Sequence, residues 1–185
     1  MSKLGCWTAL DRAAKLAGSG QLDASHADRW RRDRERIRDW VDAHCWSDAK
    51  ESYTLHPETD RLDALLLLLA TRFGFERHDR LALTRDAVRR ELCRGPLVFR
   101  YSGAEAEEGT FLACAFWLVE AFALLGEQDL AVQQMDAPLA TTSGNLGLLH
   151  EQMDPGTGAM LGNVPQALSH LALVHAALAV DEGAG

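Results

Sequence analysis

Hydrophobic residues recur at spacings of three and four along most of this chain, a pattern typical of helices that bury one face. The segment 3–17 carries such a stripe and ends at the breaker "GSG", and 25–44 carries an apolar seam within a strongly charged run. Segments 78–94 and 127–141 are amphipathic in the same way. Pro138 predicts an early end or a kink in the last of these. We expect a helix over each range.

Three other segments are apolar nearly all round, which predicts helices that are buried on most sides. They are 62–72, 108–126 and a last helix that starts near Asn163 with Pro165 in its first turn. The stretch "CWSDAKESYTLHPETD" is expected to be loop or short extended chain, and "LVFRY" (97–101) is the one good strand candidate.

About seven helices are therefore expected, and the class is all-α. More amphipathic helices alternate with more apolar ones, which fits two layers with the apolar helices inside. Helical repeat proteins also stack helices in pairs, and the sequence shows no repeat that would choose between the two arrangements.

Composition and charge limit the functional classes. The chain has 185 residues, one domain's worth, with 47% hydrophobic and 25% charged residues, as in ordinary soluble proteins. A formal net charge of −8 argues against nucleic acid as a partner. The basic-looking run 29–40 is interrupted by Asp33, Glu35 and Asp39, which favours a solvated helix face.

The cysteines and the apolar runs indicate the cellular compartment in which the protein is expected. The four cysteines are far apart and form no CxxC pair, so we expect free thiols in a reducing compartment. The N-terminal stretch lacks the apolar core of a signal peptide, and the longest apolar run, 64–70, is too short to cross a bilayer. We therefore expect a soluble, cytoplasmic protein with no membrane partner.

One carboxylate stands at an unusual place. Glu151 follows the apolar "LGLLH" and precedes the Pro- and Gly-rich turn "DPGTG", so it should lie where the chain leaves the core. A carboxylate at such an edge can face a cavity as a catalytic group. Simple exposure to solvent, the common fate of glutamate, is the alternative.

Three motifs, in order, resemble glycoside hydrolase family 15, the glucoamylases and their trehalase and dextranase relatives. The segment "HEQMDPGTGAMLGNVPQALSHLALVHAAL" resembles the family's C-terminal signature. "GPLVFRYSGAEAEEGTFLACAFWLVEAFALLG" is similar to its strand and following Glu-Gly-x-Phe helix, and "SKLGCWTALDRAAKLA" to its Ser-Lys-x-x-x-Trp helix. Together the motifs extend over essentially the whole chain.

The resemblance implies a fold and a reaction. The family folds as an (α/α)6 barrel of six inner and six outer helices, so residues 1–185 are expected to form part of one, with one short strand or hairpin. Family members hydrolyse terminal α-glucosidic bonds, such as those of maltodextrin or trehalose, with inversion, which requires a general acid and a general base. The family's base maps onto Glu151. The resemblance implies no cofactor.

Other residues match family positions with less definite roles. Arg100, Glu107 and Glu108 either line the sugar pocket or form a structural ion pair. Trp117 either packs in the core or offers an aromatic face to a sugar. The spacing of His150, His170 and His175 is poor for one metal ion, so no metal site is expected.

The general acid of the family lies in a Trp-Glu segment upstream of the Ser-Lys helix, where this sequence starts. We therefore expect a truncated chain, the C-terminal half of the catalytic domain, with little or no activity alone. It would act with a complementing N-terminal half. The alternative from another class is a non-catalytic helical remnant that is stable only through self-association or a partner.

Overall fold

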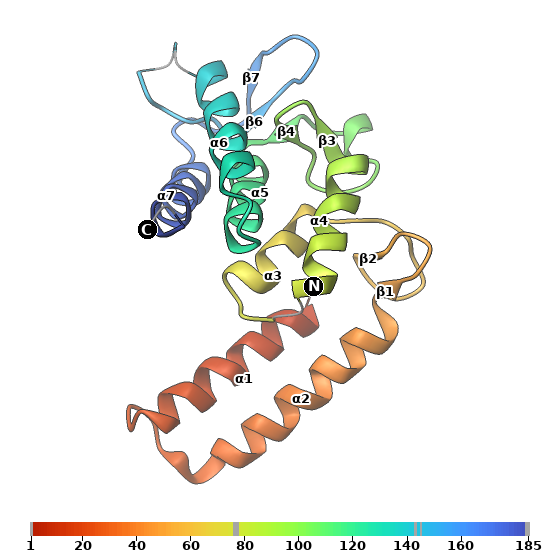
Figure 1. Ribbon diagram of the computed structural model, residues 1–185, viewed down its shortest axis with the longest axis vertical. Coiled ribbons are helices and arrows are strands. Elements are labelled where there is room, and N and C mark those ends of the chain that lie inside the picture. The colour runs from red at the N-terminus through yellow and green to blue at the C-terminus, as the bar shows by residue number, and fades with distance from the viewer. Residues whose placement is uncertain (1, 76–77, 143, 145, 184–185) are drawn as a thin grey trace.

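The computed structural model describes residues 2–75, 78–142, 144 and 146–183. Within these residues the chain is mostly helical, which confirms the predicted class (Figure 1). The helices are α1 (Ser2–Gly18), α2 (Ala27–His44), α3 (Leu68–Thr71), α4 (His78–Leu92), α5 (Leu112–Leu124), α6 (Gln128–Thr142) and α7 (Ala167–Glu182). Short 3-10 turns cover Ala24–His26, Ala64–Leu67 and Ala104–Ala106.

The strands outnumber the single strand or hairpin that was expected. Two-residue strands form two hairpins and one three-stranded antiparallel sheet among the described residues. The hairpins pair β1 (Trp46–Ser47) with β2 (Ser52–Tyr53) and β3 (Cys93–Arg94) with β4 (Leu97–Val98). The sheet has the order β5 (Thr110–Phe111), β6 (Gln152–Met153), β7 (Met160–Leu161). Elements this short leave no run of alternating residues in the sequence.

The larger core surrounds α5, which packs on α3, α4, α6 and α7. Helix α5 makes its most extensive contacts with α7 and α6 and smaller ones with α3 and α4, and α6 also contacts α7. The fold is that of a partial helical barrel, as expected. Every residue of α5 from Leu112 to Phe122 is buried, as its all-round apolar sequence predicts.

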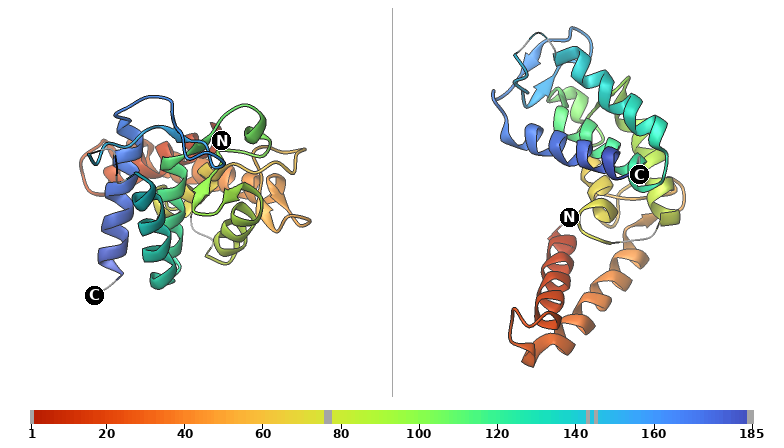
Figure 2. Two further views of the ribbon diagram at one scale, coloured as in Figure 1. Left: turned by 90° about the horizontal axis from the view of Figure 1, so that it is seen from above. Right: turned by 60° about the vertical axis from the view of Figure 1, so that its left-hand side comes forward.

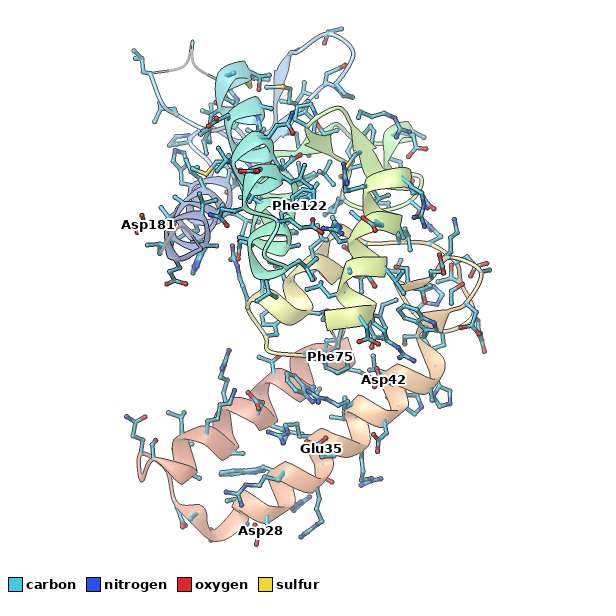
Figure 3. All side chains as sticks on the ribbon, in the orientation of Figure 1. Asp28, Glu35, Asp42, Phe75, Phe122 and Asp181 are labelled. Atoms are coloured by element: carbon cyan, nitrogen blue, oxygen red, sulfur yellow. The ribbon has the colours of Figure 1, made fainter. Side chains whose placement is uncertain are left out.

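Helices α1 and α2 form a hairpin that projects from the rest of the molecule (Figure 2). A second apolar cluster lies at its base. Phe75 occupies the junction between the hairpin and the α3 region (Figure 3), with its ring 5.2 Å from that of Trp7 and 6.0 Å from that of Tyr53. The cluster joins the projecting hairpin to the main body.

Two predicted helices differ in their details. The helix expected at 62–72 begins as a 3-10 turn, capped by the carboxylate of Asp63, which accepts the backbone N–H of Leu65 at 2.8 Å. Of the two outcomes predicted for Pro138, an early end or a kink, the early end is wrong, because α6 continues to Thr142. The hydroxyl of Thr141 donates to the carbonyl of Pro138 at 2.7 Å within this last turn.

The last helix begins at Ala167, not near Asn163, so Pro165 precedes it instead of lying in its first turn. The reason is that Asn163 still belongs to the irregular segment beside the sheet, where its carbonyl accepts the backbone N–H of Glu151 at 3.0 Å. The side chain of Gln166 then caps the helix by accepting the N–H of Leu168.

The cysteines Cys6, Cys45, Cys93 and Cys114 are free thiols, as predicted. None of the helices in the described residues is long and apolar enough to cross a membrane.

Candidate active site

Glu151 lies immediately before β6 and is half-buried. Its backbone is held on both sides. Its N–H donates to the carbonyl of Asn163 at 3.0 Å, and its own carbonyl accepts the N–H of Leu112, the first residue of α5, at 3.2 Å. The predicted position at the edge of the core is therefore correct, and the residue is anchored to the most buried helix of the molecule.

The two oxygens of the Glu151 carboxylate have different surroundings. Oε2 accepts two hydrogen bonds from Asn163, one from the backbone N–H at 3.2 Å and one from Nδ2 at 2.9 Å. Oε1 accepts no hydrogen bond from any residue that the structure describes. The carboxylate is thus fixed through Oε2, while Oε1 can accept a hydrogen bond from another molecule. We call this arrangement the Glu151–Asn163 clamp.

Gly162 makes the clamp sterically possible. Its φ of +72° lies in the left-handed region that side chains rarely adopt. A Cβ at this position would also lie 2.8 Å from Glu151 Oε2 and 2.9 Å from Glu151 Cβ, closer than nonbonded atoms approach. Both the backbone conformation and the available space therefore require glycine beside the carboxylate.

The first turn of α7 holds the two residues before Glu151. The carbonyl of Leu149 accepts the N–H of Gln166 at 2.9 Å, and the carbonyl of His150 accepts the hydroxyl of Ser169 at 2.8 Å. His170 Nε2 accepts the N–H of Leu149 at 3.3 Å. His170 Nδ1 lies 2.8 Å from the carbonyl of Gln166. His170 therefore holds the segment that leads to Glu151.

The other residues of the Glu-Gln-Met-Asp motif shape the backbone. Gln152 Oε1 accepts the N–H of Gly109 at 3.0 Å and joins β6 to the segment before α5. Met153 is buried in the main core. Asp154 Oδ1 accepts the backbone N–H groups of Gly156 and Thr157, at 2.7 and 3.0 Å, which hold the pKa of this carboxyl below its ordinary value. The motif thus places the carboxylate of Glu151 just before a tightly bonded turn.

Arg100 and Glu108 form a two-point ion pair, with Nε–Oε1 at 3.0 Å and Nη2–Oε2 at 2.8 Å. Partial burial opposes the charge of Arg100, but the hydrogen bonds and charge of Glu108 raise the pKa of Arg100 above its ordinary value. Next to the pair, Glu107 accepts the hydroxyl of Tyr101 at 2.9 Å, which raises the pKa of that phenol. The guanidinium also lies 4.8 Å from the ring of Phe111.

An open hollow of about 700 Å³ lies beside this pair and the strand that follows Glu151. Its lining includes polar side chains from two segments that the β5–β6 pairing brings together. These are Glu105, Glu107, Glu108, Gln152 and Asp154. The hollow is open, and its lining is mainly polar.

Trp117 is separated from these residues. It lies in the middle of α5 with 7% of its surface exposed, within the main core. Its Nε1 has no hydrogen-bond partner among the described residues. This position favours packing, one of the two roles considered from the sequence.

The sheet therefore brings together the segments that carry Glu107, Glu108 and Glu151, with Arg100 bonded to Glu108. Sequence reasoning matched Gly162 and Asn163 to the family pattern but assigned them no role. The signal that could have identified them is the Gly-Asn pair itself, in which glycine permits a positive φ and asparagine supplies two N–H donors to a nearby carboxylate. In the described residues, no group of three or more His, Cys, Asp or Glu side chains is arranged to hold a metal ion.

Comparisons with known proteins find similarity to trehalases and other glycosidases. No family model matches the sequence. The chain is 39% identical to a trehalase from Mycobacterium tuberculosis and 41% identical to a trehalase from Mycolicibacterium smegmatis, each over 97% of this chain and 27% of the relative. A solved glycosidase variant in complex with glucose matches the fold with a TM-score of 0.81 and 20% identity, over 95% of this chain and 50% of that chain.

These similarities confirm the resemblance that the three motifs predict. The chain spans little more than a quarter of the length of the curated relatives and about half of the solved glycosidase. Such coverage fits the C-terminal half of a glucoamylase- or trehalase-like domain.

Proposed function

We propose that this chain carries the general base of an inverting α-glucoside hydrolase, and that Glu151 is that base. The observation that supports this most directly is the Glu151–Asn163 clamp. It fixes the carboxylate through Oε2 and leaves Oε1 to accept a proton. The similarity to trehalases over nearly the whole chain supplies the class of reaction.

In the proposed step a water molecule lies between Glu151 Oε1 and the anomeric carbon of the sugar. Oε1 takes a proton from the water while the water oxygen attacks that carbon. The bond from the anomeric carbon to the glycosidic oxygen breaks, and this oxygen takes a proton from the general acid. Inverting enzymes hold the two carboxyl groups roughly 6.5–9.5 Å apart to make room for the water.

The second carboxyl group is assigned to the remainder of a longer protein or to a complementing N-terminal half, and the chain alone is proposed to have little or no activity. This assignment follows from the resemblance, which places the family's acid in a segment preceding the Ser-Lys helix. A cytoplasmic location and a role in carbohydrate metabolism are part of the same proposal.

The proposed substrate is an α-glucoside, with α,α-trehalose as the first candidate because the relatives at 39–41% identity are trehalases. Glu107 and Glu108 line the polar hollow, and Arg100 is bonded to Glu108. We assign the three residues to binding sugar hydroxyl groups. Trp117 would contribute only indirectly, by supporting the packing of α5.

The test uses a complemented enzyme, in which this chain is co-expressed with the unmatched remainder of the M. smegmatis trehalase. We expect hydrolysis of trehalose, and NMR of the fresh products should show one α- and one β-glucose, as inversion at one carbon requires. Glu151→Gln should lower kcat by at least about a thousandfold. Glu182→Gln, an exposed glutamate of α7, is the matched control and should retain full activity.

A second candidate is a non-catalytic helical subunit that functions only in association with a partner. The exposed apolar side chains of α7 favour it, since soluble monomers rarely expose such a surface. The two candidates differ in one result. A non-catalytic subunit would support the same trehalose hydrolysis in the complex with glutamine at position 151 as with glutamate.

A further inference from the structure

A small pocket lies at the base of the α1–α2 hairpin, where the hairpin meets the main body (Figure 1). Its volume is about 190 Å³. Its walls come from the start of α1, the end of α2, the segment 53–57 and the chain from the 3-10 turn into α3. It shares no lining residue with the hollow beside Glu108. We call it the hairpin pocket.

The walls of the hairpin pocket are largely apolar. Most of them belong to the second apolar cluster and are almost fully buried, namely Leu4, Val41, Tyr53, Leu66 and Leu69. Protein interiors are normally packed with few voids larger than a water molecule. An apolar cavity of about 150 Å³ is large enough to bind benzene. The hairpin pocket therefore has room for one six-membered ring with a small substituent.

The polar side chains in the wall of the pocket contribute little charge. The hydroxyl of Tyr53 donates to the carboxylate of Asp42. The hydroxyl of Thr54 lies 3.1 Å from the carbonyl of His56 and 3.2 Å from that of Cys45, so it has acceptors within the protein. Burial raises the pKa of the Cys45 thiol, which keeps this group neutral near pH 7. These three side chains are therefore uncharged.

Lys3 supplies a positive charge at the rim of the pocket. Its ammonium lies 4.0 Å from the centre of the Trp40 ring, and it forms no ion pair with any residue that the structure describes. The described lining contains no aspartate or glutamate, although the chain has a net charge of −8. The exposed ring of His56 at the same rim is neutral or positive, so it does not oppose this charge. The pocket thus complements an apolar ligand that carries one negative charge.

We propose that the hairpin pocket binds a small apolar carboxylate of about the size of benzoate. The ring would lie between Val41 and Leu66, and the carboxylate would accept hydrogen bonds from the ammonium of Lys3. Because the walls come from both the hairpin and the main body, such a ligand would hold the two together and stabilise the folded chain. Binding requires no catalysis, so the proposal is independent of the role of Glu151.

The test is a calorimetric titration of the full chain with benzoate at pH 7. Benzyl alcohol and benzylamine present the same ring without a negative charge, and acetate presents the carboxylate without the ring. Benzoate should bind at least about tenfold more tightly than these three compounds, because hydrogen bonds to charged groups are stronger than those between neutral groups and the ring fills the apolar interior.

Lys3→Glu should weaken benzoate binding at least about tenfold and should strengthen the binding of benzylamine, which is a cation at pH 7. A misfolded variant could not show this gain. Arg32→Glu makes the same change in charge at an exposed position of α2, about two helical turns before Trp40. It is the matched control and should leave both affinities as in the wild type.

Two cysteines report where benzoate binds. Cys45 lines the hairpin pocket, whereas Cys6 is exposed on α1 and is not part of the lining. Saturating benzoate should slow the modification of Cys45 by methyl methanethiosulfonate several-fold and leave that of Cys6 unchanged, as measured by peptide mass spectrometry. Three results would overturn the proposal. These are benzoate that binds no better than benzyl alcohol, wild-type benzoate affinity in Lys3→Glu, or benzoate that binds without protecting Cys45.

Discussion

Asn163 donates both its backbone N–H and its side-chain Nδ2 to the same oxygen of Glu151, at 3.2 and 2.9 Å. The two bonds orient the carboxylate without occupying Oε1. Oriented proton acceptors are effective because the reacting water needs no further reorganisation. Asn163 is therefore a positioning residue for the proposed base.

Asn163→Ala in the complemented enzyme is expected to lower kcat for trehalose about 10- to 100-fold, because hydrogen bonds to a charged group contribute about 1.5–3 kcal/mol. KM should change much less, since Asn163 contacts the base rather than the sugar in this account. Steady-state kinetics on trehalose test this. An unchanged kcat, or a loss confined to KM, would contradict the positioning role.

Gly162→Ala is expected to destabilise the fold more than Gly158→Ala. Both glycines have a φ of +72°, but a Cβ at Gly158 meets no atom within 4 Å, whereas one at Gly162 collides with Glu151. The shared backbone strain should cost about 1 kcal/mol in each variant, and the collision adds to it only at Gly162. Urea unfolding of the two variants measures the difference. Equal losses would show that the space beside Glu151 is not restricted.

The sequence predicted the helices well because their periodic apolar faces are long, local signals. It also placed Glu151 correctly, through an apolar segment followed by a turn. The start of α7 was missed because Asn163 is held by Glu151, a contact between residues twelve positions apart that no local pattern encodes. The strands of the three-stranded sheet were missed for a similar reason, since pairing such as Thr110 with Met153 depends on the packed helices around it.

The Arg72–Glu120 pair is expected to contribute strongly to stability. Arg72 Nε lies 2.9 Å from Glu120 Oε2, a second bond joins Nη2 to Oε1, and the side chains are only 20% and 6% exposed. Glu120→Gln leaves the guanidinium with a weaker partner in a buried setting, so we expect a loss of about 3 kcal/mol in the free energy of unfolding. Glu35→Gln, in the more exposed pair with Arg34, should change it by less than about 1 kcal/mol. Chemical unfolding of both variants decides this.

Asp11 is expected to make the stability of the α1–α2 hairpin depend on acid pH. Burial opposes its charge, but Lys15 at 2.8 Å and Arg34 at 2.9 Å outweigh this and hold the pKa of Asp11 below its ordinary value. The stabilisation is therefore present above the unfolded-state pKa, near 4, and is lost as pH falls through the lower folded-state pKa.

Unfolding free energies of the wild type and Asp11→Asn, measured between about pH 2 and 7, test this linkage. The variant should be less stable at pH 7, and its stability should fall less steeply below about pH 4. The highly exposed Asp28→Asn is the control and should follow the wild type. Parallel curves for Asp11→Asn and the wild type would rule out the assigned role.

Replacing Glu151 with alanine in the complemented enzyme and adding azide is the sharpest test of its proposed role as the general base. Azide can enter the vacated space and attack the anomeric carbon without losing a proton, so it does not need a base. We expect that Glu151→Ala hydrolyses almost no trehalose and that azide restores turnover with β-glucosyl azide as the product. Undiminished hydrolysis by the variant, or recovery that yields the α-glucosyl azide, would contradict it.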